Sequence, residues 1–163
     1  MESMGGLDKS TMVALSQAGA YLFITVAALG SVMGTGAAGS AAVGAWKKCY
    51  LQNKQAPFQL VIFAGAPLSQ TIYGMILMFV TLGILPGASN FWPLFLIGGV
   101  FGGLAMGLSA WWQGIAAAGA CDALAESGKG FTNYLMILGI IETVAIFVMA
   151  FGIVLISGLK QVG

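Results

Sequence analysis

Four apolar segments, near residues 12–46, 56–84, 92–126 and 131–158, most strongly limit what this chain can fold into. A helix needs about 20 residues to cross the hydrocarbon core of a bilayer, and every segment meets that length. Hydrophobic residues make up 59% of the chain and charged residues 7%, far from the usage of soluble domains. We therefore predict an all-α integral membrane protein with four transmembrane helices.

The breaks between these segments are short and rich in turn-forming or charged residues. Short connections make neighbouring helices antiparallel, so each pair of segments is expected to form a helical hairpin. Within one membrane domain, residues 1–163, the first hairpin covers 12–84 and the second covers 92–158.

Lysines are distributed unevenly among the connections, and this predicts the orientation. The first and third connections, residues 47–55 and 126–130, contain lysine, whereas the second, 85–90, contains no charge. By the positive-inside rule the first and third connections are cytoplasmic and both termini lie outside. Lys9 and Lys160 would then lie on the outer side, which weakens the excess of lysine on the cytoplasmic side.

The two predicted hairpins are similar to each other, which indicates an internal repeat. A shift of 72 residues places Gln70 over Glu142, and both hairpins begin with a helix rich in glycine and alanine. Glycines four residues apart, as in Gly30 and Gly34, let helix backbones approach closely, although such spacing is also common in ordinary transmembrane packing. The repeats are parallel, and a duplicated hairpin suits a ring whose inner wall contains the first and third helices.

Glu142 lies in the middle of the last apolar segment and is the strongest indication of function. A charged side chain at the centre of a membrane helix costs about 2.5–3.5 kcal/mol on insertion scales, so stability alone rarely explains it. The chain contains no Arg, and no Lys between Lys54 and Lys129. We therefore expect the counter-charge of this carboxylate to come from outside the chain.

Several oxygen-bearing groups are expected to lie near the same depth on three helices. Pro67 lacks a backbone N–H, so the helix is loosened there and carbonyl oxygens can turn towards a ligand. Hard cations prefer carboxylate, amide, hydroxyl and carbonyl oxygens. The candidate oxygen ligands are Glu142, Gln70, Gln113, Ser69 and the backbone carbonyl of Ala66.

Simpler explanations remain open for most of these residues individually. Ser69 can bond to its own helix backbone, Gln70 can bridge two helices, and Tyr73 can be a packing or interfacial aromatic residue. Glu142 could be a protonated acid that is hydrogen-bonded for packing, but its cost in the membrane argues against this.

At these positions the chain resembles the proteolipid ring subunit of rotary V-type ATPases, called subunit K in bacteria and the c-ring subunit elsewhere. The resemblance covers essentially the whole chain, and its strongest local matches are PLSQTIY from Pro67, QGIAAAG from Gln113 and IETVAI from Ile141. These segments are similar to the sodium-coupled bacterial members. Ala66 and Leu68 depart from the Leu-Pro-Gly order of the family.

The resemblance implies a role for each candidate residue. Glu142 is then the ion-carrying carboxylate, and Gln70 and Gln113 are side-chain ligands of Na⁺. Ser69 takes the place of a Thr ligand, Ala66 offers its carbonyl, and Tyr73 locks the loaded site by a hydrogen bond. The alternative is that only H⁺ binds, because a proton needs the carboxylate alone.

The resemblance also implies the partners of the chain. It would form a ring with copies of itself in the plasma membrane of a bacterium, surrounded by lipid. A stator subunit would supply an Arg, and central-stalk subunits would contact the cytoplasmic side. We expect no catalytic site in this chain, because nothing in it resembles a phosphate-binding loop, and no nucleic acid partner, because basic runs are lacking.

Two other functions compete with this interpretation. A small secondary transporter or an oligomeric cation channel could use Glu142 as a relay, but parallel repeats and a lone carboxylate argue against it. A structural membrane oligomer held together by its glycine faces would leave Glu142, Gln70 and Gln113 unexplained.

Overall fold

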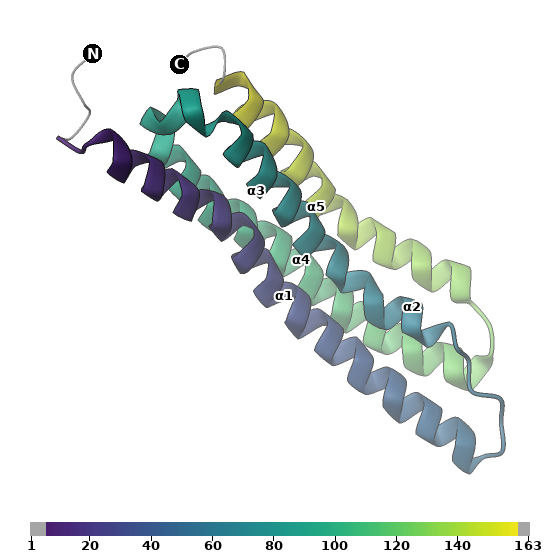
Figure 1. The fold of residues 1–163 in the computed structure, drawn as a ribbon. Coiled ribbons are helices and arrows are strands. Elements are labelled where there is room, and N and C mark those ends of the chain that lie inside the picture. The colour runs from purple at the N-terminus through teal and green to yellow at the C-terminus, as the bar shows by residue number, and fades with distance from the viewer. Residues whose placement is uncertain (1–5, 160–163) are drawn as a thin grey trace.

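A computed structural model describes residues 6–159 as an elongated helical bundle (Figure 1). Residues 1–5 and 160–163, and with them Lys160, lie outside the described residues. The prediction of an all-α membrane protein is confirmed. The elements are α1 (Lys9–Leu51), α2 (Leu60–Gly65), the 3-10 turn η1 (Ala66–Leu68), α3 (Ser69–Ala88), the 3-10 turn η2 (Ser89–Phe91), α4 (Trp92–Ser127) and α5 (Phe131–Leu159).

Three helical stretches among the described residues are long and apolar enough to cross a membrane: Lys9–Leu51, Leu60–Ser127 and Phe131–Leu159. The middle stretch has 68 residues and reverses direction near η2, so α3 and α4 run antiparallel (Figure 1). The four predicted segments therefore correspond to α1, α2 with α3, α4, and α5, and the two middle ones are joined in one bent helical stretch. That each of the four crosses a membrane stays a prediction.

The predicted connection 85–90 is itself helical, so no loop separates α3 from α4. Pro86 lies inside α3 and Ser89 begins η2. The chain turns at Ala88, whose backbone has φ −122° and ψ 14°. A reversal made from helical turns keeps most backbone groups hydrogen-bonded, which matters at the edge of an apolar bundle.

The helix ends also differ from the predicted ones at the opposite end of the bundle. α1 continues to Leu51 rather than ending near 46, because Lys47 and Lys48 favour helix and extend it beyond its apolar part. The next helix begins at Leu60 rather than near 56, since a residue before proline avoids helical geometry. The Trp46 indole donates a hydrogen bond to the Pro57 carbonyl, 2.8 Å away, and holds this connection against α1.

The ends of the bundle are arranged as two antiparallel hairpins require. α1 begins and α5 ends at the same end as the reversal between α3 and α4, whereas the α1–α2 and α4–α5 connections lie at the other end (Figure 1). Gly128, with a left-handed φ of 65°, ends α4 and donates its N–H to the Leu124 carbonyl. Which end is cytoplasmic stays a prediction.

α1 and α4 pack against each other through their glycines, as the spacing of these residues predicts. A Cβ built on Gly30 would lie 1.9 Å from the Gly107 carbonyl oxygen, and one on Gly34 would lie 2.3 Å from that of Ala110. One on Gly114 would lie 2.1 Å from the Cα of Gly34. The two backbones therefore touch, and no larger residue fits at these positions.

Corresponding helices of the two hairpins run parallel. Gly19 contacts Phe95, Gly30 contacts Gly107, and Lys48 contacts Glu126, so residue numbers rise together along α1 and α4. The division of the chain into two repeated hairpins, 12–84 and 92–158, is consistent with this direction and stays a prediction.

The apolar core consists of two clusters, one in each half of the bundle. The cluster near the connections includes Phe63, Cys121 and Leu138. The other includes Leu77 and Met106 together with Ala145. On α3, α4 and α5, the residues between the two clusters along the chain include Gln70, Gln113 and Glu142. A polar layer therefore interrupts the core midway along the bundle.

Candidate functional site

Glu142 lies on α5 where this helix faces α3 and α4. Its Oε1 accepts a hydrogen bond of 2.5 Å from the Tyr73 hydroxyl of α3. Its Oε2 accepts one of 3.1 Å from the Gln113 Nε2 of α4. The two carboxylate oxygens are thus held by donors from two different helices, which fixes the orientation of the side chain.

Gln113 is the central residue of the site. It is completely buried, and its amide nitrogen also donates to the Leu138 carbonyl at 3.0 Å. Its Oε1 accepts a hydrogen bond of 2.9 Å from Gln70, which is equally buried. Both amide protons of Gln113 are therefore used, as a buried side-chain amide requires.

Ser69 extends this network towards the 3-10 turn. Its hydroxyl lies 3.0 Å from the Ala66 carbonyl oxygen and 3.2 Å from the Gln70 Oε1. A serine hydroxyl has one proton, so it donates to one of these oxygens at a time. Pro67 lies in η1 between Ala66 and Ser69, where the helix tightens from α to 3-10 geometry.

The structure therefore links all six residues that the sequence singled out. We call this set the Glu142 network: Glu142, Tyr73, Gln113, Gln70, Ser69 and the Ala66 carbonyl. Two of the simpler explanations also describe real contacts, because Ser69 bonds to its own helix and Gln70 bridges α3 to α4. Tyr73 does more than pack, since its hydroxyl bonds directly to the carboxylate.

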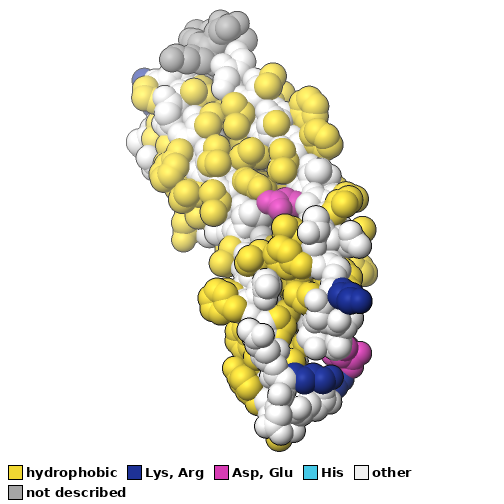
Figure 2. All heavy atoms as spheres, turned by 90° about the vertical axis from the view of Figure 1, so that its right-hand side faces the viewer, with side chains coloured by type: hydrophobic (Ala, Val, Ile, Leu, Met, Phe, Trp, Pro, Cys, Tyr) yellow, Lys and Arg dark blue, Asp and Glu magenta, His cyan; other side chains and the backbone are white. Residues whose placement is uncertain are grey.

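The surroundings of Glu142 are apolar. The side chain is half-buried, and Ile140, Val144 and Phe147 on the same helix are exposed. Figure 2 shows an acidic side chain midway along a hydrophobic face, separated from the charged side chains near the lower end. The network thus reaches a surface that lipid would cover if the chain spans a bilayer as its helices indicate.

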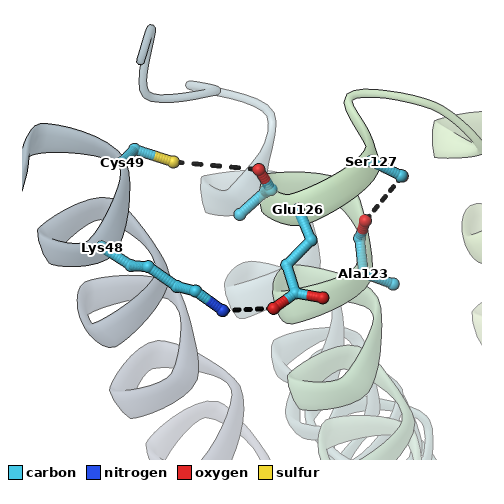
Figure 3. Close-up of polar contacts among 6 residues, drawn as sticks. Lys48, Cys49, Ala123, Glu126 and Ser127 are labelled. Atoms are coloured by element: carbon cyan, nitrogen blue, oxygen red, sulfur yellow. Dashed lines mark hydrogen bonds and ion pairs between the residues drawn. The ribbon is translucent and has the colours of Figure 1, made fainter. Parts of the chain in front are cut away.

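The acidic residues of α4 lie away from Glu142, at the connection end of the bundle. Glu126 forms an ion pair with Lys48 of α1, and the neighbouring Cys49 thiol points to the Ala125 carbonyl (Figure 3). Asp122 and Glu126 are at least two helical turns beyond Gln113 along α4, a rise of about 13 Å or more. They therefore contribute no carboxylate to the site.

Sequence reasoning missed the polar contacts that α4 makes with the backbone of α5. Ser109 donates a hydrogen bond of 2.9 Å to the Ile141 carbonyl, next to Glu142. Gln113 reaches the Leu138 carbonyl one turn away. The available signal was that Ser109 and Gln113 are four residues apart and so share one helical face.

Fold and site together define an integral membrane protein that holds one carboxylate among neutral oxygens midway along an apolar helical bundle. Residues 96–155 match the model of the ATP synthase subunit-C family. This matched segment contains most of α4 and nearly all of α5, including Gln113 and Glu142.

A curated archaeal protein is similar over a longer range. The chain is 31% identical over 144 residues to the A-type ATP synthase subunit K of Methanocaldococcus jannaschii. The alignment covers 88% of this chain and 62% of the relative, so the chain spans less than two thirds of that protein's length.

Proposed function

We propose that this chain is a non-catalytic, ion-translocating rotor subunit of a rotary ATP synthase or ATPase and carries its coupling ion on Glu142. The match of residues 96–155 to the ATP synthase subunit-C family supports this proposal, because it includes Glu142. The similarity to an A-type subunit K supports it over most of the chain. The chain would form a ring with copies of itself.

Na⁺ is the coupling ion that the Glu142 network fits best. The observation that carries this proposal is the joining of one carboxylate, two buried amides and a hydroxyl in one hydrogen-bond network. A single carboxylate matches the charge of a monovalent cation, and neutral oxygens complete the ligand set that hard cations prefer. The proposed ligands are the oxygens of Glu142, Gln70, Gln113, Ser69 and the Ala66 carbonyl.

Loading would permit Glu142 to face lipid. An ionised carboxylate is costly in hydrocarbon, whereas one paired with Na⁺ is neutral and can rotate through the bilayer with the ring. Tyr73 would hold the loaded carboxylate in place. An Arg of a stator subunit would displace the ion, and central-stalk subunits would dock at the end with the α1–α2 and α4–α5 connections.

Carbodiimide labelling of Glu142 tests the choice of ion. We expect Na⁺ at fixed pH to slow labelling of the membrane-bound chain, because a bound cation occupies the carboxylate. A labelling rate that does not respond to Na⁺ would reject the sodium site. It would favour H⁺ alone, with a protonated Glu142 donating its hydrogen bond to Tyr73 instead of accepting one.

Two variants test the carrier role itself. Glu142→Gln should assemble normally and abolish coupled ion transport, since it cannot neutralise a cation. The matched control is Glu126→Gln, which removes a carboxylate from the same bundle outside the site and should transport normally. Coupled transport by Glu142→Gln would overturn the assignment.

Microscopy separates this proposal from the secondary transporter or channel. Closed rings of many copies are expected for a rotor subunit. A dimer of the purified chain would favour the transporter, and a small pore-forming oligomer would favour the channel.

A further inference from the structure

Ser109 makes a contact that its place in a membrane helix does not require. It lies on α4 and is 6% exposed. Its hydroxyl donates a hydrogen bond of 2.9 Å to the carbonyl of Ile141 on α5. Ile141 is the residue immediately before Glu142. Hydroxyls inside helices usually bond instead to a carbonyl one turn earlier in the same helix.

Three threonine hydroxyls of the described helices follow that usual pattern. Thr25 bonds to Tyr21, Thr35 to Ser31, and Thr81 to Leu77, each within its own helix. Ser16 also reaches another element at 3.4 Å, but its shorter bond of 2.8 Å is to Met12 in its own helix. Among the serine and threonine hydroxyls of residues 6–159, that of Ser109 is distinct because it bonds to another helix and not to its own.

Ser109 acts together with Gln113. These residues are four apart on α4 and bond to two α5 carbonyls three residues apart, Ile141 and Leu138. We call the two bonds the α4–α5 clamp. One bond would let α5 pivot, whereas two bonds one turn apart fix both its height and its rotation against α4.

Within one chain few side chains of α5 are buried, so the α4–α5 clamp carries more of its alignment against α4. Along its 29 residues the buried side chains of α5 are Leu138, Ala145 and Ile156. A small rotation of α5 would move Glu142 away from Tyr73, whose hydroxyl lies 2.5 Å from the carboxylate.

From this geometry we infer that Ser109 is a positioning residue for Glu142: through the Ile141 carbonyl it fixes α5 so that the carboxylate meets Tyr73 and Gln113. The inference rests on the proposed function of Glu142 as the ion carrier. The Ser109 hydroxyl itself makes no hydrogen bond to the carboxylate or to the proposed ion ligands; its bond is to the Ile141 carbonyl.

Ser109→Ala tests the inference in the full chain in its membranes. A hydrogen bond contributes about 1 kcal/mol net, which corresponds to about a fivefold change in an equilibrium. We expect Glu142 to react with carbodiimide about fivefold faster in the absence of Na⁺, because a less firmly held carboxylate is more accessible. Half-protection should require about fivefold more Na⁺.

Three further variants make the result specific. Ser109→Thr keeps the hydroxyl and should restore both values, and Ser109→Cys, with a weaker donor, should give intermediate ones. Thr81→Val removes a buried hydroxyl that bonds within α3 and should leave both values unchanged. Wild-type values for Ser109→Ala, or equal changes in Ser109→Ala and Thr81→Val, would overturn the inference. If Ser109→Thr disturbs packing, the other two Ser109 variants decide. Both the labelling rate and the Na⁺ concentration for half-protection should then be highest in Ser109→Ala, intermediate in Ser109→Cys and lowest in the wild type.

The two readouts separate this inference from the proposed function. If Na⁺ fails to protect the wild-type chain, the sodium proposal falls. The labelling rate without Na⁺ then still decides whether Ser109 positions Glu142.

Discussion

At the scale of single residues, the polar side chains of the site differ in how deeply they are buried. Gln70 and Gln113 are fully buried and bond to each other, so they satisfy the polar layer between the two apolar clusters. Tyr73 and Glu142 are half-buried and lie at the edge of this layer. The two amides are therefore the buried part of the Glu142 network, and the carboxylate is its partly exposed end.

Tyr73→Phe should weaken ion binding without disturbing the fold. The change removes the hydrogen bond to Glu142 and keeps the ring. Hydrogen bonds to charged groups contribute about 1.5–3 kcal/mol, so we expect the Na⁺ concentration for half-protection from carbodiimide to rise about tenfold or more.

Tyr134→Phe is the matched control for this change. Tyr134 lies on α5 near the connection end and packs edge-on against Phe63, with ring centroids 6.3 Å apart. The Tyr134→Phe variant should need the same Na⁺ concentration for half-protection as the wild type. An unchanged midpoint in Tyr73→Phe would show that the hydroxyl does not hold the loaded carboxylate.

At the scale of elements, the contact between α1 and α4 decides which substitutions the helices tolerate. Gly34→Ala would place a methyl group 2.3 Å from the Ala110 carbonyl oxygen, so the backbones must separate. Overpacking of this kind costs about 1–3 kcal/mol. We expect a lower midpoint of thermal unfolding for the detergent-solubilised chain.

Gly36→Ala provides the comparison within the same helix. A Cβ at Gly36 meets no atom of the chain within 4 Å, and alanine favours helix over glycine. Its unfolding midpoint should equal or exceed that of the wild type. Equal losses in both variants would contradict the role of close backbone contact.

The first turn of α1 should respond to acid. Asp8 caps this helix by accepting hydrogen bonds from Ser10 and Thr11, chiefly from their hydroxyls, and these bonds lower the pKa of Asp8 from 3.8 to about 2. A lowered folded-state pKa means that the stabilisation is complete above pH of about 4 and is lost as the pH falls through about 2.

Amide NMR shifts of Ser10 and Thr11 between pH 5 and 1.5 would measure this transition. Asp8→Asn keeps an uncharged cap and should remove the pH dependence. A transition near the ordinary aspartate pKa of 3.8 in the wild type would show that Asp8 does not accept these hydrogen bonds in solution.

At the scale of the whole molecule, the Lys48–Glu126 ion pair joins the two hairpins at the connection end (Figure 3). The Lys48 and Glu126 side chains are 48% and 54% exposed, so solvent screens the pair and its contribution to stability is small. Lys48→Glu should lower the thermal midpoint slightly at low salt, and the exchanged pair Lys48→Glu with Glu126→Lys should recover it. Persistence of the loss at 1 M salt, where charges are screened, would contradict an electrostatic cause.

Much of the architecture could be predicted because the bilayer constrains it so strongly. Apolar length predicts helices, and Glu142 is conspicuous because a charge in an apolar segment is costly. The reversal at 85–90 was predicted as a loop because Pro86, Gly87 and Asn90 are typical of turns. A helical reversal satisfies the backbone there, which residue types alone do not reveal.

The sequence by itself determined the class of protein, singled out Glu142 as the predicted functional carboxylate, and supplied the list of polar residues that could accompany it. Each of these follows from the cost of polarity in hydrocarbon, which acts on residues one at a time. The tertiary structure decided which oxygen of Glu142 each partner contacts and that Ser109 and Gln113 hold the α5 backbone. Such contacts depend on helix rotation and height, and these are set jointly by glycine packing between α1 and α4 and by hydrogen bonds between helices.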